Sequence, residues 1–163
     1  MSGRFGRIAT LIVVVASLAI AGVVVAAETP DRALVVEDAE SGERLLEAPV
    51  ENGATVALTY THSVEKTPVR DVYVVRGDRL DLTRAEFSSY GWGFPADANV
   101  TRENGTFVYD PDVVTEEVYV SPGEVAEHRL EVDGRTHDLV ELSDGETVRV
   151  HIERRTIFER IMP

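Results

Sequence analysis

Turn signals recur at short intervals after residue 40, and they constrain the fold of this chain more than any other feature. They are Ser41-Gly42, Asn52-Gly53, Gly77-Asp78, Asn104-Gly105, Asp133-Gly134 and Asp144-Gly145. Asn-Gly and Asp-Gly readily take the positive φ angles that two-residue hairpin turns need. Runs rich in Val, Leu, Thr and Tyr lie between these turns. The spacing therefore predicts a succession of short strands joined by tight turns.

Several of these runs alternate apolar and polar side chains. In Val56–Thr61 the even positions are apolar or aromatic, and Val148–Ile152 has the same period of two. Such alternation indicates one packed and one solvated face, as in antiparallel sheets. The predicted strands are Ala33–Glu37, Arg44–Ala48, Thr55–His62, Val69–Arg76, Leu80–Phe87, Phe107–Tyr109, Val113–Val120, His128–Val132, His137–Leu142 and Thr147–Ile152. Because no stretch after Ala27 has a convincing helical period, we predict an all-β fold, a single antiparallel β-sandwich or barrel.

An uncharged hydrophobic segment precedes the predicted strands. Ile8–Ala27 has twenty residues without a charge, and as a helix it would be about 30 Å long, the thickness of a bilayer's hydrocarbon core. Arg4 and Arg7 precede it and no acidic residue does, which indicates a cytoplasmic N-terminus. We therefore predict one N-terminal transmembrane helix within residues 1–27, followed by an extracytoplasmic β domain at residues 28–163.

A cleaved signal peptide is the alternative. Val25-Ala26-Ala27 provides small residues at a position where a signal peptidase could cut, and cleavage would release a secreted β domain. Hydrophobic regions of cleaved signals usually span about 7–15 residues, and this one is longer. The length favours an uncleaved anchor in the cell membrane.

The charge balance is strongly acidic and almost free of lysine. The net charge is −13, and because Arg4 and Arg7 precede the hydrophobic segment, the β domain carries −15. Such a surface repels nucleic acid, so we expect no nucleic-acid partner. Lys66 is the only lysine, and this composition is what we expect of a halophilic protein, since molar salt screens the repulsion. The chain has no cysteine, which excludes disulfides and cysteine-based metal sites.

Two stretches differ from generic strand and turn. Tyr60–Val69 places a histidine, two hydroxyls, a glutamate and the only lysine within six residues, and Glu86–Pro95 mixes glycines with aromatics. Together they resemble the uncharacterised family catalogued as domain of unknown function 1850. The residues that carry the resemblance are His62, Ser63, Val64, Pro68, Val69, Phe87, Ser89, Gly91, Gly93 and Pro95. Trp92 and Phe94 are bulkier than the family pattern leads us to expect, which could alter any pocket there.

The resemblance implies an exported domain that is often encoded beside, or fused to, TRAP-type transporters with TAXI-class solute receptors. It supplies no catalytic residues. We therefore expect a non-enzymatic, membrane-tethered accessory domain of a solute transporter. Its ligand would be a protein partner, such as a transporter subunit or solute receptor, or a small carboxylate.

The first stretch supplies the polar part of a predicted ligand site. A lysine, a histidine and the backbone donors of a Ser/Thr-rich loop could together bind a carboxylate. Aromatic residues of the second stretch would form the walls. The predicted site residues are His62, Ser63, Lys66, Arg70, Tyr90 and Trp92. We expect neither a cofactor nor a metal.

Three other interpretations of His62 stay open. Adjacent residues of a strand point to opposite faces, so His62 and Ser63 cannot form a hydrolytic pair without a bend, and a hydrolase would need a more distant partner. A metal-binding enzyme would need distant ligands to converge, because the four histidines show no ligand spacing. In a purely structural envelope protein, His62 would close its strand through hydrogen bonds.

We further predict that the two stretches lie together in space. Thr55–His62 runs into the first stretch, Val69–Arg76 leaves it, and Leu80–Phe87 returns to the same end of the sheet. Separately, Asn99 and Asn104 begin two N-glycosylation sequons within a polar stretch, which indicates a surface loop of an exported protein.

Overall fold

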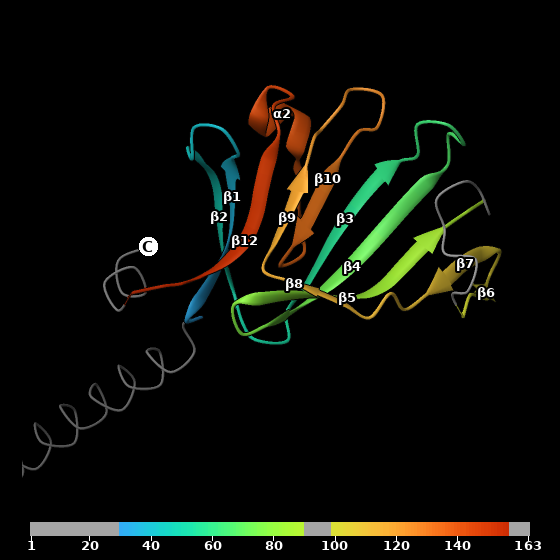
Figure 1. Ribbon diagram of the computed structural model, residues 1–163, viewed down its shortest axis with the longest axis horizontal. Coiled ribbons are helices and arrows are strands. Elements are labelled where there is room, and N and C mark those ends of the chain that lie inside the picture. The colour runs from blue at the N-terminus through green and yellow to red at the C-terminus, as the bar shows by residue number, and fades with distance from the viewer. Residues whose placement is uncertain (1–29, 90–98, 157–163) are drawn as a thin grey trace, which may run out of the picture.

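The computed structural model of the protein describes residues 30–89 and 99–156, which Figure 1 shows in colour. Strands and turns make up nearly all of this part of the chain. The strands are β1 (Arg32–Asp38), β2 (Arg44–Val50), β3 (Thr55–Thr61), β4 (Pro68–Arg76), β5 (Arg79–Phe87), β6 (Thr101–Glu103), β7 (Thr106–Tyr109), β8 (Val113–Thr115), β9 (Glu117–Val120), β10 (Arg129–Val132), β11 (Arg135–Asp138) and β12 (Val148–Arg154). A short helix, α2 (Leu139–Ser143), lies between β11 and β12.

The strands form two antiparallel sheets. The small sheet has the order β2-β1-β12-β9. The large sheet has the order β11-β10-β3-β4-β5-β7-β6, and β8 pairs with β5 as well. The small sheet therefore joins the first two strands with the ninth and the last, so both ends of the described chain lie in the same sheet.

The two sheets pack face to face around one apolar core. The small sheet contributes Leu34, Val36, Val50, Val120, Val148, Val150 and Ile152, and the large sheet contributes Val56, Leu58, Tyr73, Val75, Leu80, Leu130 and Val132. Leu139 of α2 adds to this core and is fully buried. Removing so much apolar surface from water is the main stabilising contribution to such a fold.

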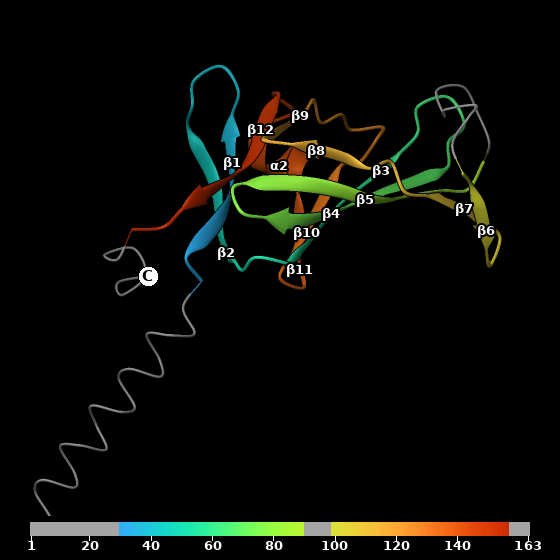
Figure 2. The same cartoon turned by 60° about the horizontal axis from the view of Figure 1, so that its bottom comes forward.

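The large sheet extends past the small sheet that covers it. Figures 1 and 2 show that the large sheet continues beyond the small sheet toward β6 and β7. We call this region the open end. The inner face of the large sheet is the face that carries the core residues. At the open end, this face carries Tyr60, Asp71, Phe87 and Tyr109.

The structure confirms the all-β prediction, and its two packed sheets make a β-sandwich-like architecture. Val113–Val120, predicted as a single strand, is instead divided at Glu116. Its first part, β8, pairs with β5, and its second part, β9, pairs with β12 of the other sheet. The predicted strands also do not include β6, whose three residues are all exposed and which pairs with β7 across the predicted turn at Asn104-Gly105.

The prediction of a strand at His137–Leu142 is correct for His137 and Asp138, which belong to β11, and wrong from Leu139 onward. The strand β11 ends at Asp138, whose carboxylate accepts hydrogen bonds from the backbone N–H groups of Val140 and Glu141 and so begins α2. Asp144 takes a left-handed conformation with φ 52° and ends the helix. Asp144-Gly145 is therefore a helix terminus, whereas the sequence predicts a hairpin turn there.

The predicted transmembrane helix at Ile8–Ala27 lies outside the described residues. Among residues 30–89 and 99–156, no helix has the length and apolar character that a membrane span requires.

Candidate functional site

The loop at His62–Thr67 is held by hydrogen bonds to His62. The Nδ1 atom of His62 accepts hydrogen bonds from the backbone N–H groups of Val64, at 3.3 Å, and Glu65, at 3.2 Å. The carbonyl oxygen of His62 accepts a third from Lys66, which has φ 53°. The ring therefore acts as the acceptor that shapes a tight loop, a common use of a polar side chain beside a turn.

The two stretches that the sequence singles out lie beside each other as far as the structure describes them. The hydroxyl oxygens of Thr67 and Ser89 are 3.2 Å apart, and Val69 of β4 lies opposite Phe87 of β5. This confirms that the two stretches meet at one end of the sheet. Tyr90 and Trp92, the predicted walls of the ligand site, lie outside the described residues.

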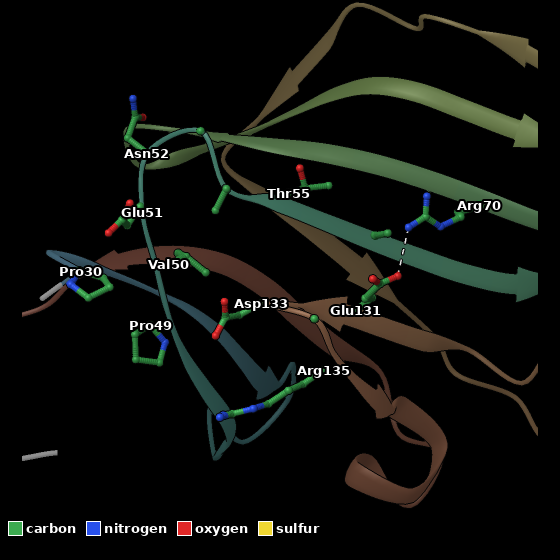
Figure 3. Close-up of a pocket in the computed structure, with 14 residues that line it drawn as sticks. Pro30, Pro49, Val50, Glu51, Asn52, Thr55, Arg70, Glu131, Asp133 and Arg135 are labelled. Carbon is green, nitrogen blue, oxygen red and sulfur yellow. Dashed lines mark hydrogen bonds and ion pairs between the residues drawn. The ribbon is translucent and has the colours of Figure 1, made fainter. Parts of the chain in front are cut away.

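Arg70 lies on the outer face of the large sheet, the face opposite the one that carries the core. Its Nη2 atom pairs with Glu131 of β10 at 3.0 Å. Both residues line an open groove of about 790 Å³, which also includes Arg135 and Asp133 (Figure 3). Arg70 is thus separated from the His62–Thr67 loop and belongs to a second, mixed-charge surface.

The inner face of the open end carries a carboxylate among tyrosines. Asp71 of β4 shares this face with Tyr73 of the same strand, Tyr60 of β3 and Tyr109 of β7. We call these four residues the Asp71 cluster. Asp71 and Ala85 are opposite each other, and so are Ala85 and Tyr109, which places Asp71 and Tyr109 two strands apart.

Burial perturbs the titration of the Asp71 cluster. Burial raises the pKa of Asp71 to about 6, because the ionised carboxylate is less well hydrated at this half-buried position than in water. Burial, together with the nearby charge of Asp71, raises the pKa of Tyr60 to about 12 and also raises the pKa values of Tyr73 and Tyr109. Across the described chain, no side chain donates a hydrogen bond to the Asp71 carboxylate and no cation pairs with it. Among the described residues, nothing compensates the negative charge of Asp71.

Aromatic rings extend the Asp71 cluster on both sides. His128, just before β10, stacks on Tyr60 with ring centroids 5.2 Å apart. Burial lowers the pKa of His128, and its buried Nδ1 atom has no hydrogen-bond partner among the described residues. On the other side, Phe87 contacts the edge of Tyr109 at 6.1 Å between centroids and stacks on Phe107 at 5.5 Å. Within the described residues, the open end thus has an aromatic inner face with a single carboxylate.

The predicted ligand site did not include this cluster, although the sequence contains a signal for Asp71. In Val69–Tyr73 the alternating positions Val69, Asp71 and Tyr73 share one face. Asp71 therefore falls on the apolar face of its strand, where a charged residue is unusual. Arg70, which belongs to the predicted carboxylate-binding site, lies on the other face of the strand.

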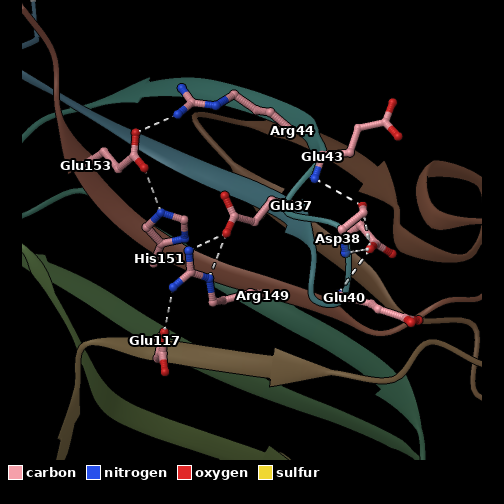
Figure 4. Close-up of polar contacts among 10 residues, drawn as sticks. Glu37, Asp38, Glu40, Glu43, Arg44, Glu117, Arg149, His151 and Glu153 are labelled. Atoms are coloured by element: carbon pink, nitrogen blue, oxygen red, sulfur yellow. Dashed lines mark hydrogen bonds and ion pairs between the residues drawn. The ribbon is translucent and has the colours of Figure 1, made fainter.

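A second polar cluster, on the outer face of the small sheet, has the composition of a metal site. Glu37, His151 and Glu153 each offer a ligand atom, and these atoms lie within 4.8 Å of one another. Arginines already hold both carboxylates, however: Arg149 pairs with Glu37, and Arg44 pairs with Glu153 at 2.7 Å (Figure 4). A divalent cation would have to displace these guanidinium groups, so the arrangement is better explained as an ion-pair ladder along β12.

The arrangement at the open end is suited to binding. Hydrolysis through His62 would need a nucleophile or acid within about 3 Å of its ring. Among the described residues, the atoms that hydrogen bond to this ring are backbone N–H groups. The described part of the open end instead provides aromatic surface and one carboxylate, groups that can hold a ligand.

The comparisons with known proteins place the large sheet in a family. The model of the family described as domain of unknown function (DUF1850) matches residues 56–139, from β3 to the first residue of α2. The matched part contains the His62–Thr67 loop and every residue of the Asp71 cluster, and it leaves out β1, β2 and β12. No curated protein and no solved structure gave a significant match. The match covers just over half of the chain, and the chain therefore belongs to the DUF1850 family.

Proposed function

We propose that this protein is a non-enzymatic, membrane-tethered, extracytoplasmic accessory domain of a TRAP-type solute transporter. In this proposal the segment Ile8–Ala27 anchors the chain, and the open end docks on a transporter subunit or on its solute receptor. The hydrophobic length of that segment, the resemblance of the His62 and Phe87 stretches, and the membership of the DUF1850 family support this role.

The observation that carries the docking role is a pair of exposed valines at the open end. Val64 in the His62–Thr67 loop is 76% exposed, and Val125 in the loop before β10 is 68% exposed. These loops are neighbours, because the backbone N–H of Thr61 donates to the carbonyl oxygen of Ala126 at 2.7 Å. Large apolar side chains gathered on neighbouring loops are typical of surfaces that meet a partner.

Site-specific photo-crosslinking tests this role. A benzophenone amino acid replaces Val64 in the full chain, expressed in its native host, and the crosslinked products are identified by mass spectrometry. We expect one dominant product, which contains a TRAP-type membrane subunit or solute receptor.

Val114 is the matched control position. It is also an exposed valine, at 51%, but it lies on β8 opposite Asp81, at the far end of β5 from Phe87. The same probe at Val114 should give no such product. Equal crosslinking from both positions, or products without any transporter component, would contradict the proposal.

A second candidate function, binding of a small carboxylate, is favoured by the groove in Figure 3. Arg135 lines this groove, and no described residue forms an ion pair with its guanidinium group. Arg70 lies in the same groove but already pairs with Glu131. An unpaired guanidinium beside a hollow is a suitable group for a carboxylate ligand, which it can bind through two parallel hydrogen bonds.

Calorimetric titration with succinate tests the carboxylate role. The change Arg135→Gln should weaken succinate binding at least tenfold, because it removes the charge and the forked donors. Arg79→Gln is the control, since Arg79 is an exposed arginine outside this groove. Absence of saturable binding, or equal binding by both variants, would eliminate this candidate.

A further inference from the structure

We propose that the Asp71 cluster binds the positively charged head of a small organic cation, an alkylated ammonium group. This inference is separate from the docking role, because the cluster lies on the inner face of the sheet and the exposed valines lie on the loops at its end. It concerns a small molecule, and it uses Asp71, Tyr60 and Tyr109 as the recognising groups.

The charge of Asp71 is the first argument. Its neighbour Arg70 points to the other face of β4 and pairs there with Glu131 at 3.0 Å. In the described chain, no guanidinium, ammonium or imidazole group forms an ion pair with Asp71. A half-buried carboxylate without a counter-charge is unfavourable, and a bound cation would supply the missing charge.

The surrounding rings are the second argument. Tyr60, Tyr73 and Tyr109 all lie near enough for the charge of Asp71 to raise their pKa values, and each ring has an electron-rich face. Tyr60, Tyr109 and Asp71 are only partly buried in the described structure, so a ligand can reach them. Rings gathered around a carboxylate are the usual means of recognising alkylated ammonium groups.

The donor set disfavours an inorganic cation at this position. Calcium takes about 6–8 oxygen ligands from carboxylates, carbonyls and water, and magnesium takes about six in strict octahedral geometry, several of them waters. The inner face of the open end offers Asp71 as its single carboxylate among the described residues. Its tyrosines keep their protons, since burial raises their pKa values. A large, weakly hydrated cation therefore fits this site better than a small, strongly hydrated one.

Binding of a cation should depend on pH in a defined direction. A cation favours ionised Asp71, so below about pH 6 the site must first lose a proton and the affinity falls. The other titratable groups that face Asp71 are Tyr60, Tyr73 and Tyr109, and His128 lies behind Tyr60. The tyrosines stay neutral because their pKa values are raised, and burial lowers the pKa of His128, which favours its uncharged form.

Titration with tetramethylammonium chloride tests the proposal. The full chain, in detergent micelles, is titrated by calorimetry at pH 8 and pH 5, with sodium chloride added to keep the ionic strength constant. We expect saturable binding at pH 8 and binding at least fivefold weaker at pH 5. Tert-butanol, which has a similar shape without the charge, should bind at least tenfold more weakly than tetramethylammonium.

Two variants separate this site from general attraction to an acidic surface. Asp71→Asn keeps the shape and should weaken tetramethylammonium binding at least tenfold. Glu124→Gln removes one charge from an exposed loop and should leave the binding unchanged. Near-ultraviolet circular dichroism verifies that both variants fold, and Tyr109→Leu provides a second test, with an expected loss of at least threefold. Unsaturable binding, equal binding of tert-butanol, or equal losses in Asp71→Asn and Glu124→Gln would overturn the proposal.

Discussion

The hydroxyl oxygens of Thr67 and Ser89 lie 3.2 Å apart and join the two stretches that distinguish this chain from a generic β domain. Thr67 ends the loop that His62 shapes, and Ser89 lies two residues after Phe87, the last residue of β5. This hydrogen bond therefore fixes the position of the His62–Thr67 loop relative to the end of β5. Docking through Val64 depends on that position, because Val64 lies in the same loop.

Removing the Thr67–Ser89 hydrogen bond should loosen the loop without unfolding the domain. We expect Thr67→Val and Ser89→Ala each to lower the free energy of unfolding by about 1 kcal/mol, the usual net contribution of a partly buried hydrogen bond. The double variant should lose less than the sum of the single losses, because the two hydroxyls share one interaction. Chemical denaturation of the four proteins measures this coupling, and strictly additive losses would show that the hydroxyls do not interact.

The fold class could be predicted because its signals are local. Alternation in β3 and β12 and the turn at Asp133-Gly134 depend on neighbouring residues alone, and these features have the predicted form. The meeting of the two stretches also followed from sequence order, since β3, β4 and β5 are consecutive and antiparallel.

Other features depend on contacts that no local pattern encodes. Val113–Val120 contains no glycine, proline or other turn residue, yet it is divided between two sheets because its halves pair with β5 and with β12. The burial of Asp71 could have been recognised from its place in β4. Its neighbour Tyr109 could not, because the two residues share a face only through the pairing of β7 with β5.

The stability of the domain should respond to pH through Asp71. Its pKa is raised from an ordinary 3.8 to about 6 in the folded state, so the folded protein holds this proton more tightly than the unfolded chain does. This contribution to stability is fully present below about pH 4 and is lost as the pH rises through 6. Integrated over that window, the loss is about 2–3 kcal/mol.

Comparison with Asp71→Asn isolates this contribution from other titrating groups. The unfolding free energy of each protein is measured at pH 4 and at pH 8. From pH 4 to pH 8, the difference between the variant and the original protein should shift by about 2–3 kcal/mol in favour of the variant. Glu124→Gln, at an exposed site, should show no such gain. If the difference between Asp71→Asn and the original protein were the same at both pH values, Asp71 would titrate normally in the folded protein.

The hydrophobic segment should remain attached in the mature protein. Ile8–Ala27 is longer than the hydrophobic region of most cleaved signals, so we expect an uncleaved anchor. Intact-mass spectrometry of the membrane fraction from the native host should find a species that retains Arg4 and Arg7. Detection only of soluble chains that begin at Ala27 or Glu28 would identify a cleaved signal peptide instead.

Folding of the domain should require salt. Residues 28–163 carry a net charge of −15, and this repulsion opposes the compact state in dilute buffer. Salt also weakens the ion pairs, but pairs such as Arg44–Glu153 are exposed on both sides and contribute little, so screening of the net repulsion should dominate. The midpoint of thermal unfolding should therefore rise by several degrees as potassium chloride increases into the molar range. Sucrose at matched osmolarity does not screen charge and should produce a smaller rise. A midpoint that stays flat or falls with potassium chloride would contradict a halophilic protein.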